Sequence, residues 1–317
     1  ANATNKKVIW SSDNEEVATV DEMGNVTARG LGNATITATT EDGGKTATCK
    51  ITVSNVINST QQKTYEAIQE AINGAEAGDT ISVGPGTYHG YLEIHKSINL
   101  LGPNAGIPGY SEERGSEAIL TVPEYVYLED PVWDESAVIL VKASGVTIDG
   151  FRITGDNGNG KTNYAGCNIQ AGLGNKAEID RNMMDNLTFR NNVVDCFSVA
   201  GICVEQIMDQ ADIESMEGYF ENLIVTENLI QNIHDLNYDG YAYAIYVERT
   251  KNGIITNNVV KNSRRGICVA PVDVKGGGLV KDNNVETYEM GLLYGSARDG
   301  AGPWKFQKNI VCAIDST

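Results

Sequence analysis

Apolar and polar residues alternate in short stretches along most of the chain, and in its second half the alternation repeats. Five similar phrases each place an asparagine after a short apolar stretch: LTFRNNVV from Leu187, LIVTENLI from Leu223, GIITNNVV from Gly253, LVKDNNVE from Leu279 and KFQKNIV from Lys305. A second phrase precedes each copy: AGCNIQ from Ala165, AGICVEQ from Ala200, YAIYVER from Tyr243, RGICVAP from Arg265 and MGLLYGS from Met290. Each unit predicts strand, loop, strand and turn without a helix. One unit cannot bury its apolar face alone, so the copies are expected to stack into a solenoid.

The asparagines of the first phrase are expected to form a ladder inside this solenoid. Taken at the same place in each copy, they are Asn192, Asn228, Asn258, Asn284 and Asn309. In parallel rungs they lie about 4.8 Å apart, the usual strand spacing, so their amides can hydrogen-bond along the stack. We therefore predict a structural role for them rather than a catalytic one.

Residues 6–54 predict a small antiparallel β-sandwich, because apolar and polar positions alternate in short strands that turns separate. The run WSSDNEEVATVDEMGNVTARGLGNATITAT from Trp10 resembles the bacterial Ig-like domains of group 2. Members of that family usually have further strands ahead of the tryptophan, so the resemblance implies a domain at 1–54 that is incomplete at its N-terminus. It also implies an extracellular bacterial protein, secreted or displayed on the cell surface, in which this module is a spacer or an adhesive unit.

A short amphipathic helix is predicted at residues 64–75, after a linker at 55–63, because apolar residues recur there at helical spacing with Thr64 as the candidate N-cap. Such a helix can cover the first open sheet edge of the solenoid. Residues 67–103 resemble the opening of the right-handed parallel β-helix proteins of the pectin lyase-like superfamily. Their sequence is AIQEAINGAEAGDTISVGPGTYHGYLEIHKSINLLGP. The expected fold is all-β: a partial Ig-like β-sandwich, a capping helix and a right-handed parallel β-helix at 64–317 that continues beyond the C-terminus.

Composition and charge narrow the classes of partner. The 317 residues include 24 basic and 42 acidic side chains, and the formal net charge of −18 makes nucleic acid or an anionic membrane surface an unfavourable partner. No stretch of 18 apolar residues occurs, so we predict no membrane span. Cys203 and Cys268 share a column of the predicted solenoid, but the rung of Tyr246 separates them by roughly 9 to 10 Å, beyond the reach of a disulfide. Free thiols are therefore expected.

The outward positions of the second phrase carry the candidate chemistry. Alternation predicts one outward column of Cys203, Tyr246, Cys268 and Leu293, and beside it a column of Gln170, Glu205, Glu248, Ala270 and Gly295. Glu205 and Glu248 thereby become neighbours on adjacent rungs, and two carboxylates about 5 Å apart need a cation, a shared proton or a nearby base. One interpretation is a Ca²⁺ or acid–base site beside the aromatic platform of Tyr246. The other is two solvated carboxylates.

The charge pattern around these residues predicts a groove. Ten acidic and no basic residues occur from Glu205 to Glu248, whereas seven basic residues and only Asp273 occur from Arg249 to Lys281. The same rungs carry the longest loops, 207–220 and 234–242, which are expected to wall the outward sheet face. The alternative is a solvated charged surface. His234 lies in one of these loops beside Asp235, whereas the DNGNG run at 156–160 is interpreted as a plain turn, because it lacks the last ligand of a calcium loop.

The leading functional hypothesis is a polysaccharide-binding β-helix with lyase chemistry on uronic-acid polymers. β-Elimination needs a carboxylate neutraliser, here Ca²⁺, and a base that removes the C5 proton. The candidate residues are Glu205 and Glu248 for the metal, Arg249, Lys251 and Arg265 for proton removal, and Tyr246 and Arg264 for substrate binding. The characteristic motifs of lyases, methylesterases and galacturonases on this fold are absent. A non-catalytic adhesin and a glycoside hydrolase that uses both glutamates therefore stay open, and the expected partner is a polysaccharide or cell-wall glycan.

Overall fold

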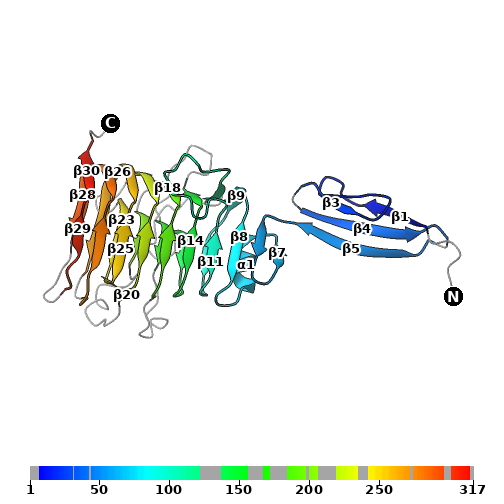
Figure 1. The fold of residues 1–317 in the computed structure, drawn as a ribbon, viewed down its shortest axis with the longest axis horizontal. Helices are drawn as coiled ribbons and strands as arrows, with labels where there is room; N and C mark the ends of the chain where they lie inside the picture. Colours follow the sequence, from blue (N-terminus) through cyan, green and yellow to red (C-terminus); the bar gives the residue numbers. More distant parts are fainter. Residues whose placement is uncertain are drawn as a thin grey trace, which may run out of the picture.

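The computed structural model shows an elongated protein in which an Ig-like module and a β-helix follow one another along the long axis (Figure 1). The structure describes residues 7–30, 32–42, 44–121, 137–155, 167–171, 184–197, 200–205, 219–234, 242–271, 274–295 and 301–314. Among these residues, no helix is long and apolar enough to cross a membrane.

The Ig-like module consists of two small antiparallel sheets, as the alternation predicts. One sheet has the order β1-β4-β5, and the other is a hairpin of β2 and β3. The strands are β1 (Val8–Ser12), β2 (Ala18–Val20), β3 (Val26–Ala28), β4 (Gly32–Thr40) and β5 (Thr46–Val53). Val17, Ala18 and Ala34 are buried together, and Ile51 and Val53 of β5 pack partly buried against them. The first five residues of β5 are exposed, so much of this sheet has no cover.

The β-helix is built from rungs of parallel strands that form three sheets, and its regularity confirms the predicted solenoid. The first sheet contains β8 (Thr80–Val83), β11 (Asn99–Leu101), β14 (Thr147–Asp149), β17 (Thr188–Arg190), β21 (Ile224–Thr226), β25 (Gly253–Thr256), β27 (Gly278–Lys281) and β29 (Lys305–Gln307). The second contains β9 (Gly86–His89), β12 (Ala118–Thr121), β15 (Arg152–Thr154), β18 (Val193–Phe197) and β22 (Leu229–Ile233). The third contains β10 (Leu92–Ile94), β13 (Ala137–Val141), β16 (Cys167–Ala171), β19 (Ala200–Val204) and β23 (Tyr243–Glu248).

Near the C-terminal end the second and third sheets become continuous. Strands β26 (Val259–Ala270) and β28 (Asn284–Tyr294) each pass through both sheets, and β30 (Ile310–Ala313) extends the second. Two short strands, β20 (Phe220–Glu221) and β24 (Thr250–Lys251), pair at the corner between the third and first sheets. The three sheets enclose one apolar core, in which Phe151, Phe189 and Phe220 are among the largest fully buried side chains.

The first rung is covered at its N-terminal end by a hairpin and a helix. Strand β6 (Val56–Asn58) pairs antiparallel with both β7 (Lys63–Tyr65) and β8, and α1 (Ile68–Gly74) buries Ile68, Ala71 and Ile72. The capping helix is thus confirmed, but it is shorter than predicted, and Thr64 lies in β7 rather than at its N-cap. The predicted linker at 55–63 is corrected as well. Val56 and Asn58 are buried and Ile57 is exposed, so this segment alternates as a strand and joins the first sheet.

The asparagine ladder forms as predicted, with one correction of register. Its members are Asn192, Asn228, Asn258, Asn283 and Asn309, and each side-chain amide donates to the next Oδ1 at 2.9 to 3.2 Å. Asn283 replaces the predicted Asn284, because Gly278 and not Leu279 pairs with Gly253, which moves the rung by one residue. The exposed Asn284 instead begins β28. The preceding rung has Phe151 at this position, and its backbone N–H donates to Asn192 Oδ1 at 3.0 Å.

Candidate functional site

The outward face of the third sheet is organised in columns that the strand register fixes. One column reads Glu93, Leu140, Gln170, Cys203, Tyr246, Cys268 and Leu293. The predicted neighbours of Tyr246 in this column are thereby confirmed. Gln170 was expected in the adjacent glutamate column, but Cys167 pairs with Ala200, so Gln170 lies opposite Cys203. The phrase beginning at Ala165 is therefore offset by two residues from the phrase at Ala200.

Local packing explains why the second phrase contains a small residue before its apolar pair. In β23, both Ala244 and Ile245 belong to the solenoid core, and Tyr243 and Tyr246 flank them outside it. Two successive inward residues fit only when the first is small. At the equivalent Gly201, a Cβ atom would lie 2.6 Å from the carbonyl oxygen of Ala244 and 2.8 Å from Ile230. The sequence pattern small–Ile–X–Val thus directs the third residue, X, to the outward face.

Tyr246 lies at the edge of a second apolar cluster, outside the solenoid core. The cluster consists of Ala137, Leu140, Ala200 and Cys203, with the partly buried Tyr246 packed against it. The rings of Tyr243 and Tyr246 tilt against each other with centroids 5.4 Å apart. Burial raises the pKa of Tyr246, and the negative charges of Glu248 and Glu205 raise it further, so the phenol stays protonated. The partly exposed Tyr246 ring, backed by the buried Tyr243 ring, thus forms an aromatic surface bordered by carboxylates.

Glu205 and Glu248 follow directly on from this surface. Val204 pairs with Val247, so the register places the two glutamates at the ends of adjacent parallel strands, as the sequence predicts. Burial raises the pKa of Glu205, and a hydrogen bond with the Cys203 thiol opposes the shift only in part. The negative charges of both carboxylates raise the pKa of Tyr246, so the three side chains are coupled electrostatically. A carboxyl group of raised pKa beside a second carboxylate can donate a proton while its neighbour stays charged.

The basic residues named from the sequence do not all reach this group. Arg249 is buried at 3% exposure and turns the corner after β23 with a φ of 44°. Lys251 lies beyond that corner on β24, where its Nζ pairs with Glu221 Oε1 at 3.0 Å. The hydrogen bond and charge of Glu221 raise the pKa of Lys251, which disfavours loss of its proton. Neither residue is therefore positioned as a base on the outward face of the third sheet.

Arg264 and Arg265 share a partner that the sequence reasoning missed. Glu289 of β28 forms ion pairs with Arg264 and with Arg265, the latter at 2.7 Å. Burial raises the pKa of Glu289, but the hydrogen bonds and charges of both arginines outweigh burial and lower it. The Arg265 guanidinium also lies 5.3 Å from the Tyr243 ring centroid. Arg265 thus lies beside the aromatic surface. The phrase alignment contained a signal for its partner Glu289, because Glu289 directly precedes Met290, the residue that pairs with Arg265.

The two cysteines and the histidine of this region are packed against neighbouring side chains. Cys203 and Cys268 are free and buried, as predicted, and burial raises the pKa of Cys268 to about 12. A protonated thiol is a poor nucleophile. His234 stacks on Tyr288 with centroids 5.8 Å apart, and its Nδ1 lies 3.0 Å from the Tyr288 hydroxyl. Burial lowers the pKa of His234, so the neutral ring dominates near neutral pH.

A calcium ion at Glu205 and Glu248 would need further ligands. Ca²⁺ takes six to eight oxygen ligands, and the described residues contain no group of three or more His, Cys, Asp or Glu side chains that could hold a metal. The two glutamates supply carboxylate oxygens of the right chemistry but only part of a coordination shell. Most of the predicted loops at 207–220 and 234–242 and the DNGNG run lie outside the described residues.

Comparison with known proteins identifies the N-terminal module. Residues 1–51 match the family of bacterial Ig-like domains, group 2. An uncharacterised protein of Clostridium acetobutylicum is 42% identical over 59 residues, which is 18% of this chain and 6% of that protein. The kappa-carrageenase of Pseudoalteromonas carrageenovora is 58% identical over 43 residues, 14% of this chain and 11% of that enzyme. The chain thus spans a small part of both relatives.

One solved structure aligns with most of the chain. A pectin methylesterase in complex with a hexasaccharide aligns with 84% of this chain and 92% of its own, at a TM-score of 0.40 and 12% identity. The assignment of a parallel β-helix does not depend on this alignment, because the strand register of the present structure establishes it. The N-terminal family match confirms the resemblance to Ig-like domains.

Proposed function

We propose that this protein is a secreted or cell-surface bacterial protein that binds a polysaccharide on the outward face of the third sheet. The observation that carries the proposal is the partly exposed Tyr246 ring, which is backed by the buried Tyr243 ring and has Glu205 and Glu248 on one side and Arg265 on the other. Aromatic rings pack against the apolar faces of sugar rings, and carboxylate and guanidinium groups bind sugar hydroxyls. The Ig-like module supports a location outside the cell.

Glycoside hydrolysis is the chemistry that this arrangement supports best. Glu205, whose carboxyl pKa is raised, donates its proton to the glycosidic oxygen as the bond to C1 breaks. Glu248 lies on the adjacent rung, about 5 Å away by the spacing of the strand backbones, and a carboxyl separation of the same size would suit a nucleophile that forms a glycosyl ester. Water then cleaves the ester, Glu205 takes its proton, and the anomeric configuration is retained.

A calcium-dependent lyase is the second candidate. Arg265, one of the residues predicted to remove a proton, pairs with Tyr243 on the rung next to Tyr246, which supports this alternative. In that reaction Ca²⁺ bound by Glu205 and Glu248 would neutralise a uronate carboxylate. Arg265 is paired with Glu289, and because a guanidinium is a poor base, this residue would serve better as a cation than as the group that removes the proton.

The test is incubation of the full chain with neutral and uronate polysaccharides, with Ca²⁺ or with a chelator. Hydrolysis predicts new reducing ends without ultraviolet absorbance, insensitivity to the chelator, and loss of at least about 100-fold in rate for Glu205→Gln and for Glu248→Gln. Unsaturated products that need Ca²⁺ would establish the lyase instead. Glycan binding that Tyr246→Ala weakens, without any product, would establish an adhesin. A rate unchanged in both glutamine variants would overturn the proposed site.

A further inference from the structure

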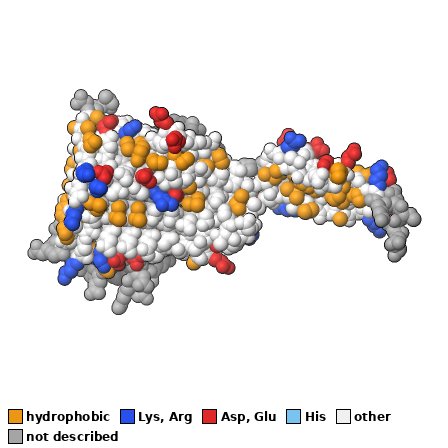
Figure 2. Space-filling model, in the orientation of Figure 1, with side chains coloured by type: hydrophobic (Ala, Val, Ile, Leu, Met, Phe, Trp, Pro, Cys, Tyr) orange, Lys and Arg blue, Asp and Glu red, His pale blue; other side chains and the backbone are white. Residues whose placement is uncertain are grey.

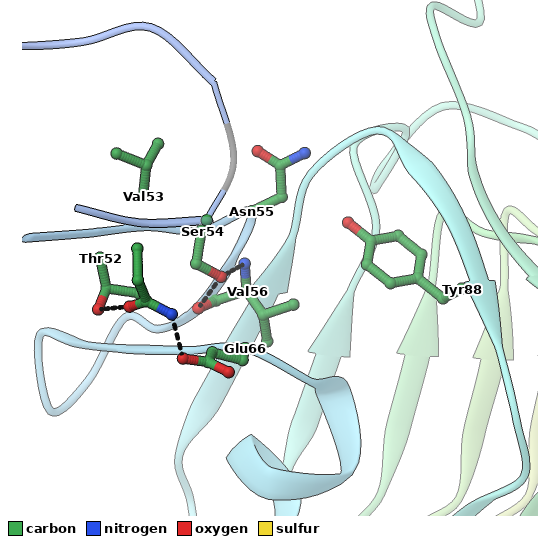
Figure 3. Close-up of a pocket in the computed structure, with 9 residues that line it drawn as sticks. Thr52, Val53, Ser54, Asn55, Val56, Glu66 and Tyr88 are labelled. Carbon is green, nitrogen blue, oxygen red and sulfur yellow. Dashed lines mark hydrogen bonds between the residues drawn. The ribbon is translucent and has the colours of Figure 1, made fainter. Parts of the chain in front are cut away.

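A pocket lined by both polar and apolar groups lies at the junction of the Ig-like module and the β-helix, remote from the third-sheet face around Tyr246 (Figure 3). Its volume is about 180 Å³. The lining includes Asn33, Thr52 and Ser54 from the Ig-like side and Glu66 and Tyr88 from the β-helix side. Because both modules contribute side chains, the pocket exists only when they meet in this arrangement.

Hydrogen bonds within the pocket hold its polar groups in fixed orientations. The Thr52 hydroxyl donates to Asn33 Oδ1 at 2.8 Å, and Asn33 Nδ2 donates to Glu66 Oε1 at 2.6 Å. Figure 3 shows this chain of contacts crossing from Thr52 to Glu66. Ser54 Oγ accepts from the backbone N–H of Val56 at 2.9 Å. The groups are therefore oriented before any ligand arrives, which reduces the entropy lost on binding.

The hydrogen bond between Asn33 and Glu66 leaves a second amide hydrogen of Asn33 as a donor beside the second carboxylate oxygen of Glu66 as an acceptor. Asn33 Nδ2 carries two hydrogens and uses one on Glu66, and Glu66 Oε2 has no hydrogen-bond partner among the residues that the structure describes. Two vicinal hydroxyl groups of a sugar ring match such a pair, since one can accept from the amide and the other can donate to the carboxylate. The half-buried Tyr88 ring supplies an apolar wall, and its hydroxyl is held by Gly84 O at 2.8 Å.

The charge of the pocket selects among sugars. Glu66 is its one ionisable acid, and the lining contains no lysine or arginine. A uronate would be repelled by Glu66 without any compensating cation. We propose that the junction pocket binds one neutral pyranose residue, through Asn33 and Glu66 to two adjacent hydroxyls and through Tyr88 to the face of the ring. The occupied pocket would also tie the two modules together, because the ligand contacts both.

The experiment is titration of the full chain, followed by NMR and calorimetry, with the methyl glycosides of glucose, galactose and mannose and with methyl glucuronide. At least one neutral glycoside is expected to bind with millimolar affinity and the glucuronide not to bind. Glu66→Gln and Tyr88→Ala should each weaken binding about tenfold, the loss expected when one charged hydrogen bond or one packed ring is removed. Glu70→Gln at an exposed position of α1 and Tyr110→Ala at an exposed tyrosine outside the pocket are the matched controls and should bind normally.

The site is separable from the one around Tyr246. Glu205→Gln should leave glycoside binding at the junction unchanged, and Glu66→Gln should leave cleavage of a polysaccharide unchanged. Absence of binding for all neutral glycosides would overturn the proposal. So would binding that Glu205→Gln removes, or binding that survives both Glu66→Gln and Tyr88→Ala in variants whose circular dichroism matches the parent protein.

Discussion

The Ig-like module and the β-helix are both built from short strands, yet they bury very different fractions of their apolar side chains. Among the described residues of the module, only Val17, Ala18, Ala34 and Ile36 are buried hydrophobics. Figure 2 shows apolar side chains along the visible face of the module. In the β-helix, each inner rung is covered by a rung on both sides, so its inward residues form one continuous core. Repetition supplies neighbours that a small sandwich lacks.

The comparison predicts two unfolding transitions of unequal stability. A domain with few buried apolar residues gains little free energy from burial and stays marginal. The β-helix adds to its core a ladder of buried amides that satisfy one another and the backbone. The module is therefore expected to unfold first, and the variants below are chosen to act on one region at a time.

The largest effect is expected for Asn283→Ala in the ladder. Its Oδ1 accepts from Asn258 N at 2.9 Å and from Asn258 Nδ2 at 3.0 Å, and its Nδ2 donates to Ile255 O at 2.9 Å. Alanine removes the acceptor of the Asn258 N–H and the side-chain donor to Ile255 O, whereas Asn258 Nδ2 keeps Val225 O and Thr256 O, so the loss should be about 3 kcal/mol of unfolding free energy. Denaturant unfolding followed by circular dichroism measures the loss in the second transition.

Asn284→Ala is the matched control for this ladder variant, one residue away. Asn284 is exposed at the start of β28, so its replacement should change the unfolding free energy by less than about 0.5 kcal/mol. Equal losses for the two variants would contradict the observed register. The pair also decides between the sequence alignment, which favours Asn284, and the structure, which places Asn283 in the ladder.

The next effect is expected for Ile36→Ala in the module. Ile36 of β4 is 3% exposed, and truncation of a buried isoleucine to alanine costs roughly 2 to 4 kcal/mol. Because the module has few other buried side chains, this loss should unfold it at room temperature and leave the β-helix transition in place. Scanning calorimetry and proteolysis near residue 54 measure both. A shift of the β-helix transition by the same amount would show that the two regions unfold as one unit.

The sequence predicts the architecture well because the same pattern of strands recurs in several copies. The prediction of register fails where two alignments of a copy, one or two residues apart, fit the pattern equally well. The pair Asn283–Asn284 offers two asparagines for one ladder position, and Gln170 fits either of two columns until the pairing of Cys167 is known. Glu289 was missed for a different reason, since it lies just ahead of the phrase that begins at Met290, although its ion pairs join residues 24 and 25 positions away on the neighbouring rung. Extending the phrase alignment by one residue would have placed Glu289 beside the arginines of that rung.

A smaller, pH-dependent effect is expected for Glu205→Gln. Burial raises the folded-state pKa of Glu205, so its contribution to stability is full below the unfolded pKa, near 4.3, and is lost as pH rises through the folded pKa. At pH 7 the glutamine variant should therefore be more stable than the parent, and near pH 4 the difference should vanish. Thermal unfolding at several pH values measures this. A parent that is more stable than the variant at pH 7 without added cations would contradict the assigned burial of the carboxylate.

The smallest effect on stability is expected at the junction, where Asn33→Ala removes one of the hydrogen bonds between the two regions. Asn33 is exposed, and its hydrogen bonds to Thr52 and Glu66 compete with water, so the free energy of unfolding of either region should fall by about 0.5 kcal/mol or less. The geometry should respond more than the stability. Because the Asn33–Glu66 hydrogen bond joins the two modules, its loss should broaden the distribution of their relative orientations, measured as a less extended average shape by small-angle X-ray scattering. An unchanged scattering profile would show that the chain between Val53 and Val56 alone sets the angle between the two regions.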